Sequence, residues 1–245
     1  MKAVRRAELA FWSIFWKLPD LTLFIELDGV KFAFSSRRPH NVLVASGLYE
    51  LDLVRRAMSV LRDGDVFLDV GAHIGAYTLR AAKRVGESGR VYAVEPDPMN
   101  ARLLRSSVRV NGFSNVIVIE AAASDVEGDA EFWMHPKGDM SSVSRIWGGN
   151  RLTKVRTIRL SKIINEDDVR LVKVDVEGYE DRIIPDLLDN IKFDYALIET
   201  HTPHGKSICK LMNRPNIESK ILHVSATGQI LWIKNISSCS MKNKD

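Results

Sequence analysis

Short apolar runs alternate with amphipathic stretches over most of this chain, and each run stops at a small or acidic residue. An apolar run with such ends is typical of a buried strand, whereas apolar residues three or four positions apart are typical of a helix. The runs occupy residues 65–70, 90–94, 116–119, 171–176 and 195–198, and the helical stretches occupy residues 76–83, 98–110 and 179–188. Strands that alternate with helices predict an α/β fold with a mainly parallel sheet covered on both faces.

The beginning of the chain has a different pattern. Residues 21–34 alternate around the dipeptide Asp28-Gly29, which is the strongest short signal for a β-hairpin. Helical spacing follows in residues 49–61. We therefore expect two parts, an N-terminal helix, hairpin and helical cap in residues 1–60 and the main α/β domain in residues 61–245.

The later part of the chain contains shorter elements. Residues 135–151 are rich in glycine and serine and predict a loop, and a loop this long inside a compact domain is often functional. Short strands are predicted for residues 131–134 and 155–160, a short helix for 206–212, and a closing hairpin for 221–224 and 230–233. The hairpin would add antiparallel pairing at one edge of the sheet.

Composition and charge add few constraints. Apolar residues make up 45% and charged residues 27% of the chain, as in ordinary globular proteins. The net charge of +4 permits a nucleic-acid partner, although solvated surface lysines and arginines account for it more simply. Cys209 and Cys239 have no disulfide or metal-ligand spacing, so a reduced, cytoplasmic setting is expected.

The first residues admit several interpretations. Arg5 and Arg6 precede an apolar, tryptophan-containing segment at residues 9–16. The segment resembles a signal peptide, but it is short and no small-residue cleavage site follows. It could bind a membrane surface as a basic amphipathic helix, or pack as a helix on the main domain or a partner subunit. No apolar run has the length of a membrane span.

The most informative stretch is the glycine loop after the first core strand. A strand, a glycine turn, a helix and a second strand ending in an acid form a nucleotide-binding βαβ pattern. Gly71 and Gly75 have the spacing G-x-x-x-G rather than G-x-G-x-x-G, and Asp69 precedes them. A carboxylate at this point would repel a pyrophosphate and suits a cationic ligand without phosphate, such as S-adenosylmethionine (SAM). Glu95, about 20 residues further on, is placed to accept the ribose hydroxyls. A simpler alternative is a strand-to-helix turn that binds no ligand.

Three blocks in this region resemble a known family. Residues 69–75, 94–98 and 173–178 are similar to the signature blocks of the FkbM family of SAM-dependent methyltransferases, and Glu50 and Glu199 also fit its pattern. The resemblance covers roughly residues 45–200. It departs from the family at His73, where the family more often has asparagine.

The resemblance implies a Rossmann-like class I methyltransferase with a mainly parallel seven-stranded sheet, an antiparallel C-terminal hairpin and SAM as cofactor. Together with the loop pattern, it assigns residues in the loops at the strand ends to the cofactor. These are Glu50, Asp69, Gly71, Ala72, His73, Gly75, Glu95, Pro96, Ala123, Ser124 and Asp125, with Ser124 or Asp125 beside the adenine.

The candidate catalytic residues follow the fourth and fifth core strands. Asp175 and Glu177 are the best-placed groups to take a proton from a hydroxyl acceptor. Lys173 has the same strand parity as Asp175 and is either its buried partner or a substrate contact. Alternatively, Glu177 and Lys173 pair and cap the next helix. His201 could act as a base or be an ordinary surface residue in a turn.

A possible metal site and a possible lid concern the side of the site where the methyl acceptor would bind. Asp175, Glu199 and His201 could bind a hard cation, but their pattern is too loose to predict a metal site. Polar residues of the long loop could line the acceptor pocket as a lid, or simply be solvated. These are His135, Asp139, Ser141, Ser142 and Ser144.

Three functions remain open from the sequence. The resemblance favours O-methylation of a small molecule or a sugar hydroxyl, with a small-molecule or glycan acceptor. An RNA methyltransferase is the second alternative, suggested by the basic pI near 9.0. The third is a SAM-binding protein without catalytic activity. The oligomeric state is not predicted.

Overall fold

A computed structural model describes residues 19–36, 38, 41, 50–134, 143, 151–164, 168–201, 208, 212–224 and 228–236. Several predictions lie wholly or mostly outside these residues. They are the N-terminal helix with its membrane or subunit contact, the long loop with its lid residues, and the short helix at residues 206–212. Within the described part of the chain, no helix is both long and apolar enough to cross a membrane.

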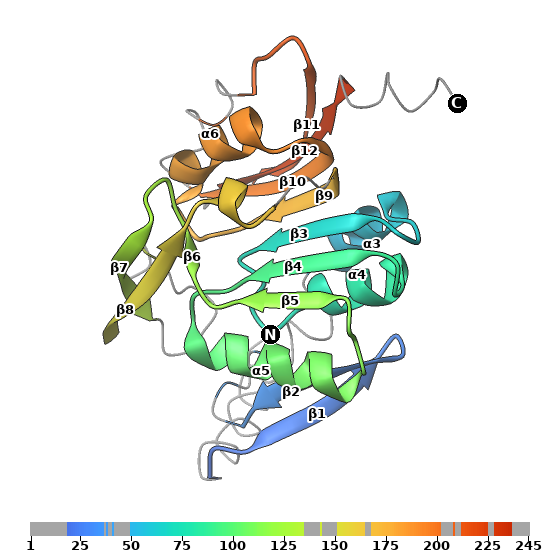
Figure 1. The fold of residues 1–245 in the computed structure, drawn as a ribbon, viewed down its shortest axis with the longest axis vertical. Coiled ribbons are helices and arrows are strands. Elements are labelled where there is room, and N and C mark those ends of the chain that lie inside the picture. The colour runs from blue at the N-terminus through green and yellow to red at the C-terminus, as the bar shows by residue number, and fades with distance from the viewer. Residues whose placement is uncertain are drawn as a thin grey trace, which may run out of the picture.

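The main sheet has seven strands, in the order β11-β12-β10-β9-β3-β4-β5 (Figure 1). Its parallel strands are β3 (Val66–Val70), β4 (Arg90–Val94), β5 (Val116–Ile119), β9 (Val169–Val174) and β10 (Phe193–His201). The terminal hairpin of β11 (Ile217–Val224) and β12 (Gly228–Asn235) pairs antiparallel with β10. The predicted α/β fold, a mainly parallel seven-stranded sheet with an antiparallel C-terminal hairpin, is confirmed.

Strand β10 is longer than the sequence predicts. The apolar run ends at Ile198, but antiparallel pairing with β12 continues as far as His201 and Gly228. His201 therefore ends a strand and is buried, rather than standing in a surface turn. The alternative of His201 as a surface residue is wrong.

Helices cover both faces of the main sheet, and strand parity decides which face each side chain meets. Helices α3 (Leu51–Val60), α4 (Thr78–Val85) and α5 (Pro98–Val110) lie on one side, and α6 (Glu180–Asn190) with the short helix η2 (Leu160–Lys162) on the other. Phe67 and Leu171 pack towards α3 and α4, whereas their neighbours Leu68 and Val172 pack towards α6. Odd-numbered residues at the ends of β3 and β9 thus share the face of α3 and α4.

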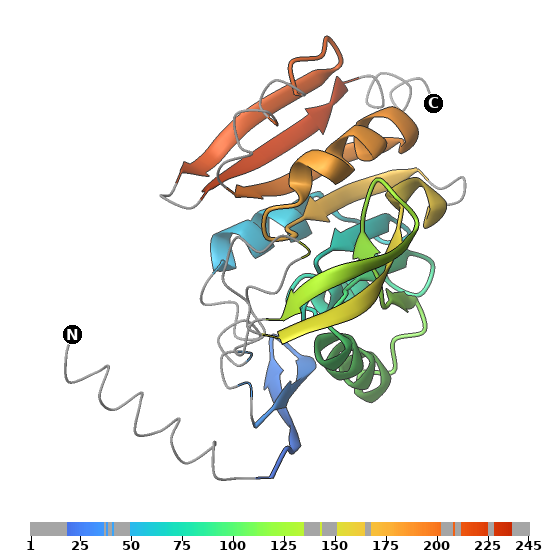
Figure 2. The same ribbon diagram turned by 90° about the vertical axis from the view of Figure 1, so that its left-hand side faces the viewer.

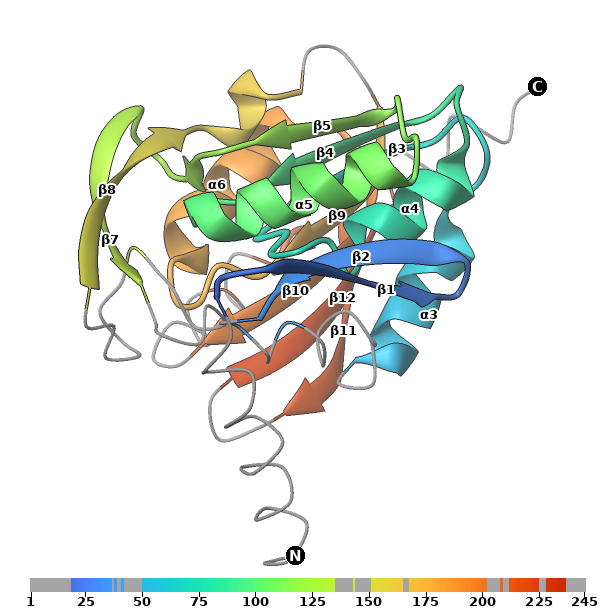
Figure 3. The same cartoon turned by 90° about the horizontal axis from the view of Figure 1, so that it is seen from below.

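The predicted N-terminal hairpin is confirmed as β1 (Thr22–Leu27) and β2 (Val30–Ser35). Asp28 and Gly29 have φ angles of 56° and 68°, as a tight hairpin turn requires. The hairpin lies along α5 (Figure 3), where the amide of Ala33 donates a hydrogen bond of 2.8 Å to Oγ of Ser107. The division into parts at residue 60 stays a prediction.

A three-stranded sheet stands beside the carboxyl ends of the parallel strands (Figure 2). It consists of β6 (Ala122–Ala123), β7 (Gly128–Met134) and β8 (Arg151–Ile158), with β8 in the middle. The predicted strands at 131–134 and 155–160 overlap β7 and β8, and these two strands pair with each other rather than with the main sheet. Strand β8 ends before Leu160 because the chain turns there into η2.

Candidate functional site

Two glycines fix the loop between β3 and α4. Gly71 has φ of 79°, and a β-carbon there would lie 1.8 Å from the carbonyl oxygen of Asp175. Gly75 has φ of 95°, and its β-carbon would meet Leu104 at 2.5 Å. His73 is also left-handed, with φ of 53°. Histidine and asparagine both tolerate this conformation better than most residues, so histidine at this position preserves the loop.

The N–H groups of this loop are occupied within the protein. The amides of Gly71 and Ala72 both donate to the carbonyl of Val94, at 2.9 and 3.0 Å, and that of Gly75 donates to Ala72. The amide of His73 donates to Oε2 of Glu95 at 2.8 Å. A pyrophosphate-binding loop instead points its N–H groups at the phosphates. The loop geometry therefore fits a ligand without phosphate, as the sequence predicts.

Asp69 lies buried behind this loop, with 1% of its surface exposed. Its Oδ2 accepts a hydrogen bond of 2.6 Å from Thr78, which ties the end of β3 to the start of α4. Its Oδ1 is buried and has no hydrogen-bond partner in the described part of the chain. Burial raises the pKa of Asp69 above its usual value. Asp69 thus adds a buried carboxyl group to the part of the site beside the glycine loop. Its contact with the cofactor stays a prediction.

Glu95 directly follows β4, and both of its carboxylate oxygens accept hydrogen bonds. Oε1 accepts from the amide of Asp97 at 2.9 Å and from Nδ2 of Asn100 at 3.4 Å, and Oε2 accepts from His73. A carboxylate offers about four acceptor positions, so capacity for a ribose hydroxyl remains. Burial, with a smaller contribution from Asp97, raises the pKa of Glu95 to about 7. The residue fits the predicted ribose-binding role.

The residues assigned to the rest of the nucleoside lie at neighbouring strand ends. Ala123 ends β6, and the amide of Ser124 donates to the carbonyl of Ile158 at 2.9 Å. Asp125 pairs with Arg182 at 3.3 Å. Pro96 is half-buried between Glu95 and the capping residue of α5. Their contacts with a cofactor stay predictions.

Lys173 is a buried cation at the junction of β9 and the glycine loop. Its Nζ donates to the carbonyl of Gly71 at 2.9 Å and to Oδ2 of Asp175 at 3.3 Å, and it lies 3.9 Å from Oδ1 of Asp69. Burial alone would lower the pKa of Lys173, but these carboxylates, Asp175 foremost, hold it above its usual value. Lys173 is therefore a buried partner of Asp175, one of the two alternatives drawn from the sequence.

Glu50 and Tyr77 close the α3 side of the site. The hydroxyl of Tyr77 donates to Oε2 of Glu50 at 2.8 Å, and Nζ of Lys173 lies 5.5 Å from the centre of the Tyr77 ring. Burial, followed by the charge of Asp175, raises the pKa of Glu50. The sequence assigned Glu50 to the site but not Tyr77. The signal in the sequence that could have indicated Tyr77 is its position as an aromatic residue just after the glycine loop.

His201 lies at the centre of an acidic group. Its Nδ1 lies 2.9 Å from Oε1 of Glu180, and its Nε2 lies 3.3 Å from Oε2 of Glu177 and 3.7 Å from Oε1 of Glu199. Burial lowers the pKa of His201, but Glu180, Asp175 and Glu177 outweigh it and raise the value to about 9. Burial and the neighbouring charge of Asp175 raise the pKa of Glu177 and of Glu199.

The backbone after β9 is shaped to hold this group. Glu177 has φ of 57° and Gly178 has φ of 98°, and the amide of Gly178 donates to Oε1 of Glu180 at 2.9 Å. Glu180 is fully buried, and its only local signal in the sequence is that it is an acid in the first turn of α6. Three ligand atoms, one each from Asp175, Glu177 and His201, lie within 4.8 Å of one another. The possible metal ligands considered from the sequence were Asp175, Glu199 and His201, with Glu199 in place of Glu177.

The site as a whole is strongly acidic. Carboxyl groups outnumber cationic and basic side chains, which are Lys173 and His201. The carboxyl groups are those of Glu50, Asp69, Asp175, Glu177, Glu180 and Glu199. Such a site favours a cationic ligand, can accept a proton and repels phosphate.

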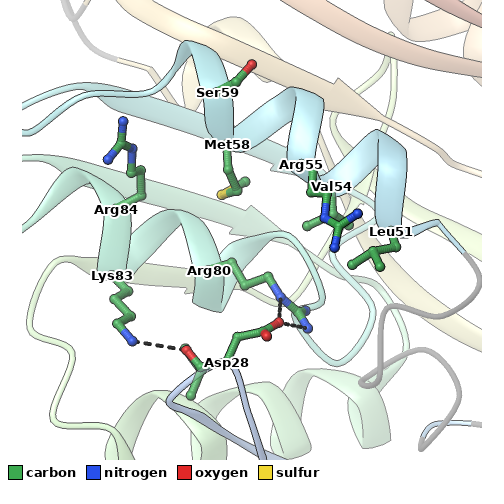
Figure 4. Close-up of a pocket in the computed structure, with 10 residues that line it drawn as sticks. Asp28, Leu51, Val54, Arg55, Met58, Ser59, Arg80, Lys83 and Arg84 are labelled. Carbon is green, nitrogen blue, oxygen red and sulfur yellow. Dashed lines mark hydrogen bonds and ion pairs between the residues drawn. The ribbon is translucent and has the colours of Figure 1, made fainter.

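A separate groove of about 670 Å³ lies between α3, α4 and the turn of the N-terminal hairpin (Figure 4). Its apolar base includes Val30, Val54 and Met58. Arg80 pairs with Asp28 at 3.0 Å, and Lys83 donates to the carbonyl of Asp28 at 3.0 Å. The cations of this groove therefore serve in part to hold the hairpin. No pattern in the sequence predicts the groove.

This chain is similar to several known methyltransferases. Residues 69–224 match the family model described as the methyltransferase FkbM domain. A probable cobalt-precorrin-6B C(15)-methyltransferase (decarboxylating) of Sulfolobus acidocaldarius is 44% identical over 63 residues, which are 26% of this chain and 33% of that protein. The ribosomal RNA large subunit methyltransferase E of Bdellovibrio bacteriovorus is 25% identical over 169 residues, which are 65% of this chain and 81% of that protein. The match to the first of these relatives thus spans only about a third of its length.

A solved structure shows the same fold. The crystal structure of TYW2 from M. jannaschii in complex with AdoMet has a TM-score of 0.53 and 14% sequence identity, and the match covers 89% of each chain. The predicted Rossmann-like architecture is thereby confirmed, and SAM as the cofactor belongs to the proposed function. The chain therefore belongs to the FkbM methyltransferase family.

Proposed function

We propose that this enzyme methylates a hydroxyl group of a small molecule or a sugar. The observation that carries the proposal is the acidic cluster of Asp175, Glu177, Glu199 and His201 beside the glycine loop. A hydroxyl is a weak nucleophile until its proton is removed, and this cluster offers proton acceptors where the acceptor must meet the donor.

The chain's own residues account for binding on the donor side. SAM supplies, when bound, a methyl group on a cationic sulfonium. Glu95 accepts hydrogen bonds from the ribose, and Gly71 lets the cofactor loop approach the backbone of Asp175 closely. The negative charge of Asp69 and Glu50 favours the cation. The protein mainly has to hold the two reactants in line.

On the acceptor side, Asp175 is the central residue. Nζ of Lys173 donates a hydrogen bond of 3.3 Å to Oδ2 of Asp175 and so fixes this carboxyl group. During transfer the acceptor oxygen forms a bond to the methyl carbon, the carbon–sulfur bond breaks, and its electron pair stays on sulfur. The hydroxyl proton passes to a carboxylate of the cluster. Glu177 and His201 position the acceptor, while Lys173 acts through Asp175.

The acidic site disfavours RNA as the acceptor, because a group of carboxylates repels a polyanion. Two observations favour RNA. The groove between α3 and α4 is lined in part by cations, namely Arg55, Arg80, Lys83 and Arg84. One relative is the ribosomal RNA large subunit methyltransferase E of Bdellovibrio bacteriovorus. Filter binding to RNA at several salt concentrations separates the two functions. A steep fall in affinity with salt, together with methyl transfer to the RNA, would favour the alternative.

A direct test combines binding with turnover. Thermal unfolding with and without SAM should show stabilisation by the cofactor. Transfer of labelled methyl groups to a panel of catechols, sugars and glycosides should reveal the acceptor class. Asp175→Asn should keep the SAM-induced shift and lose turnover, whereas the exposed variant Asp189→Asn should keep both. Full turnover by Asp175→Asn with every acceptor would contradict the assignment. A cytoplasmic setting, inferred from the cysteines, remains part of this proposal.

A further inference from the structure

The carboxyl ends of β9 and β10 bring three potential metal ligands together. Asp175 and Glu177 follow β9, and His201 ends β10, the adjacent parallel strand. Their ligand atoms lie within 4.8 Å of one another. This spacing is close to that around a divalent cation, whose oxygen and nitrogen ligands each lie about 2.0–2.3 Å from the metal.

The ring of His201 is held in the way that is typical of metal-binding histidines. Nδ1 of His201 lies 2.9 Å from Oε1 of Glu180, which leaves Nε2 directed at Glu177. Metal-binding histidines almost always bond a carboxylate or carbonyl through the second ring nitrogen. Glu180 is fully buried and is itself fixed by the amide of Gly178. The ring orientation is therefore set before any ligand arrives.

A second observation comes from Asp175. Its Oδ2 is held by Lys173, but its Oδ1 is buried and has no hydrogen-bond partner in the part of the chain that the structure describes. A buried acceptor without a partner costs about 1–3 kcal/mol, so a native structure normally supplies one. Within the same cluster, Glu177 adopts a left-handed backbone conformation that only Gly, Asn, Asp and His adopt readily. The site holds an orphaned carboxylate oxygen and a strained carboxylate residue side by side.

We propose that Asp175, Glu177 and His201 bind one divalent cation, such as Mn²⁺ or Mg²⁺. Two carboxylates and one imidazole suit such a cation and leave positions open for the acceptor oxygen. This inference rests on the proposed O-methylation. A cation bound to the hydroxyl lowers its pKa, and the released proton passes to Glu199, which lies 3.7 Å from His201 but outside the ligand set.

The test uses Mn²⁺ alone on the full-length chain, with binding followed by electron paramagnetic resonance and by calorimetry. The wild type should bind one Mn²⁺ per chain. Glu177→Gln and His201→Asn should each weaken binding at least tenfold. Glu218→Gln and His223→Asn change the same residue types at exposed positions of β11 and should bind as the wild type does. Addition of a chelator should remove turnover and restored Mn²⁺ should return it.

The outcomes separate this proposal from the proposed function. Absence of Mn²⁺ binding at millimolar concentration would overturn the metal site, as would equal binding by the Glu177→Gln/His201→Asn double variant. The SAM-induced thermal shift is measured on the same samples and reports folding and cofactor binding independently. O-methylation that persists in chelator would overturn the metal site and leave the proposed function standing.

Discussion

A β-carbon on Gly71 would lie 1.8 Å from the carbonyl oxygen of Asp175, so the cofactor loop and the acceptor side touch through bare backbone. The amide of Asp175 also donates to the carbonyl of Val70 at 3.0 Å. The two halves of the site are thus held in register by β3 and β9 themselves. Any residue other than glycine at position 71 must separate them.

Gly71→Ala should therefore destabilise the protein and abolish SAM binding. The left-handed φ costs about 1–2 kcal/mol, and displacement of the Asp175 carbonyl adds to it, so a loss of about 3 kcal/mol or more is expected. Gly112→Ala is the matched control, because Gly112 has φ of 69° but open space around its β-carbon. It should cost only the left-handed penalty of about 1–2 kcal/mol. Urea unfolding and calorimetry with SAM measure both effects, and similar losses in the two variants would contradict the close approach.

Much of this site follows from the sequence because its parts are local. The strand, the glycine spacing and the acid at Glu95 fall within one βαβ unit, and strand parity places Lys173 beside Asp175. The contacts that the sequence did not indicate join distant residues. Tyr77 reaches Glu50 only because α3 packs beside α4. His201 is buried only because β12 pairs with β10 as far as the end of β10. Pairing of this kind depends on the whole sheet and leaves no local pattern.

The affinity for SAM should rise with pH through the titration of Glu95. The folded-state pKa of about 7 lies above the usual 4.5, so the protonated form favours folding. That contribution is full below pH 4.5 and is lost as the pH rises through 7. Ribose hydroxyls donate to the ionised form, so SAM should bind up to about tenfold more tightly at pH 8 than at pH 6.

Glu95→Gln provides the control for this pH dependence. It removes the titrating group while keeping the side-chain size, so the affinity should be lower and nearly independent of pH. Calorimetric titrations at pH 6, 7 and 8 give the comparison. A pH dependence in Glu95→Gln as steep as that of the wild type would assign the effect to another group.

Lys173→Met should be among the most damaging single changes. It leaves the carboxylates of Asp69 and Asp175 buried without their cation, which typically costs about 3–5 kcal/mol. In the wild type the raised pKa of Lys173 means that its stabilisation is complete below its unfolded pKa of 10.5 and is lost only above it. In the variant the carboxyl groups can be neutralised by protonation, so the deficit should shrink as the pH falls towards 4.

The control is Lys192→Met, which removes an exposed lysine paired with Asp168 at 2.8 Å. Surface pairs contribute about 0–1 kcal/mol, so its unfolding should be nearly unchanged. Urea unfolding at pH 7 and pH 4 gives both comparisons. Equal stability of the two variants at pH 7 would show that Lys173 does not neutralise the buried carboxylates.

Two adjacent serines of α5 test whether the N-terminal hairpin folds with the main domain. Oγ of Ser107 accepts from the amide of Ala33 and is fully buried, whereas Ser106 is partly exposed and its hydroxyl donates to the carbonyl of Arg102 in the same helix. Ser107→Ala leaves the Ala33 amide without a partner and should cost about 1–3 kcal/mol. Ser106→Ala should change stability by less than about 0.5 kcal/mol. If the hairpin is part of the domain's cooperative unit, urea unfolding of Ser107→Ala stays a single transition with a lower midpoint. An unchanged midpoint, with faster hydrogen exchange confined to Ala33 and its strand, would instead show that the hairpin opens independently and would support a boundary near residue 60.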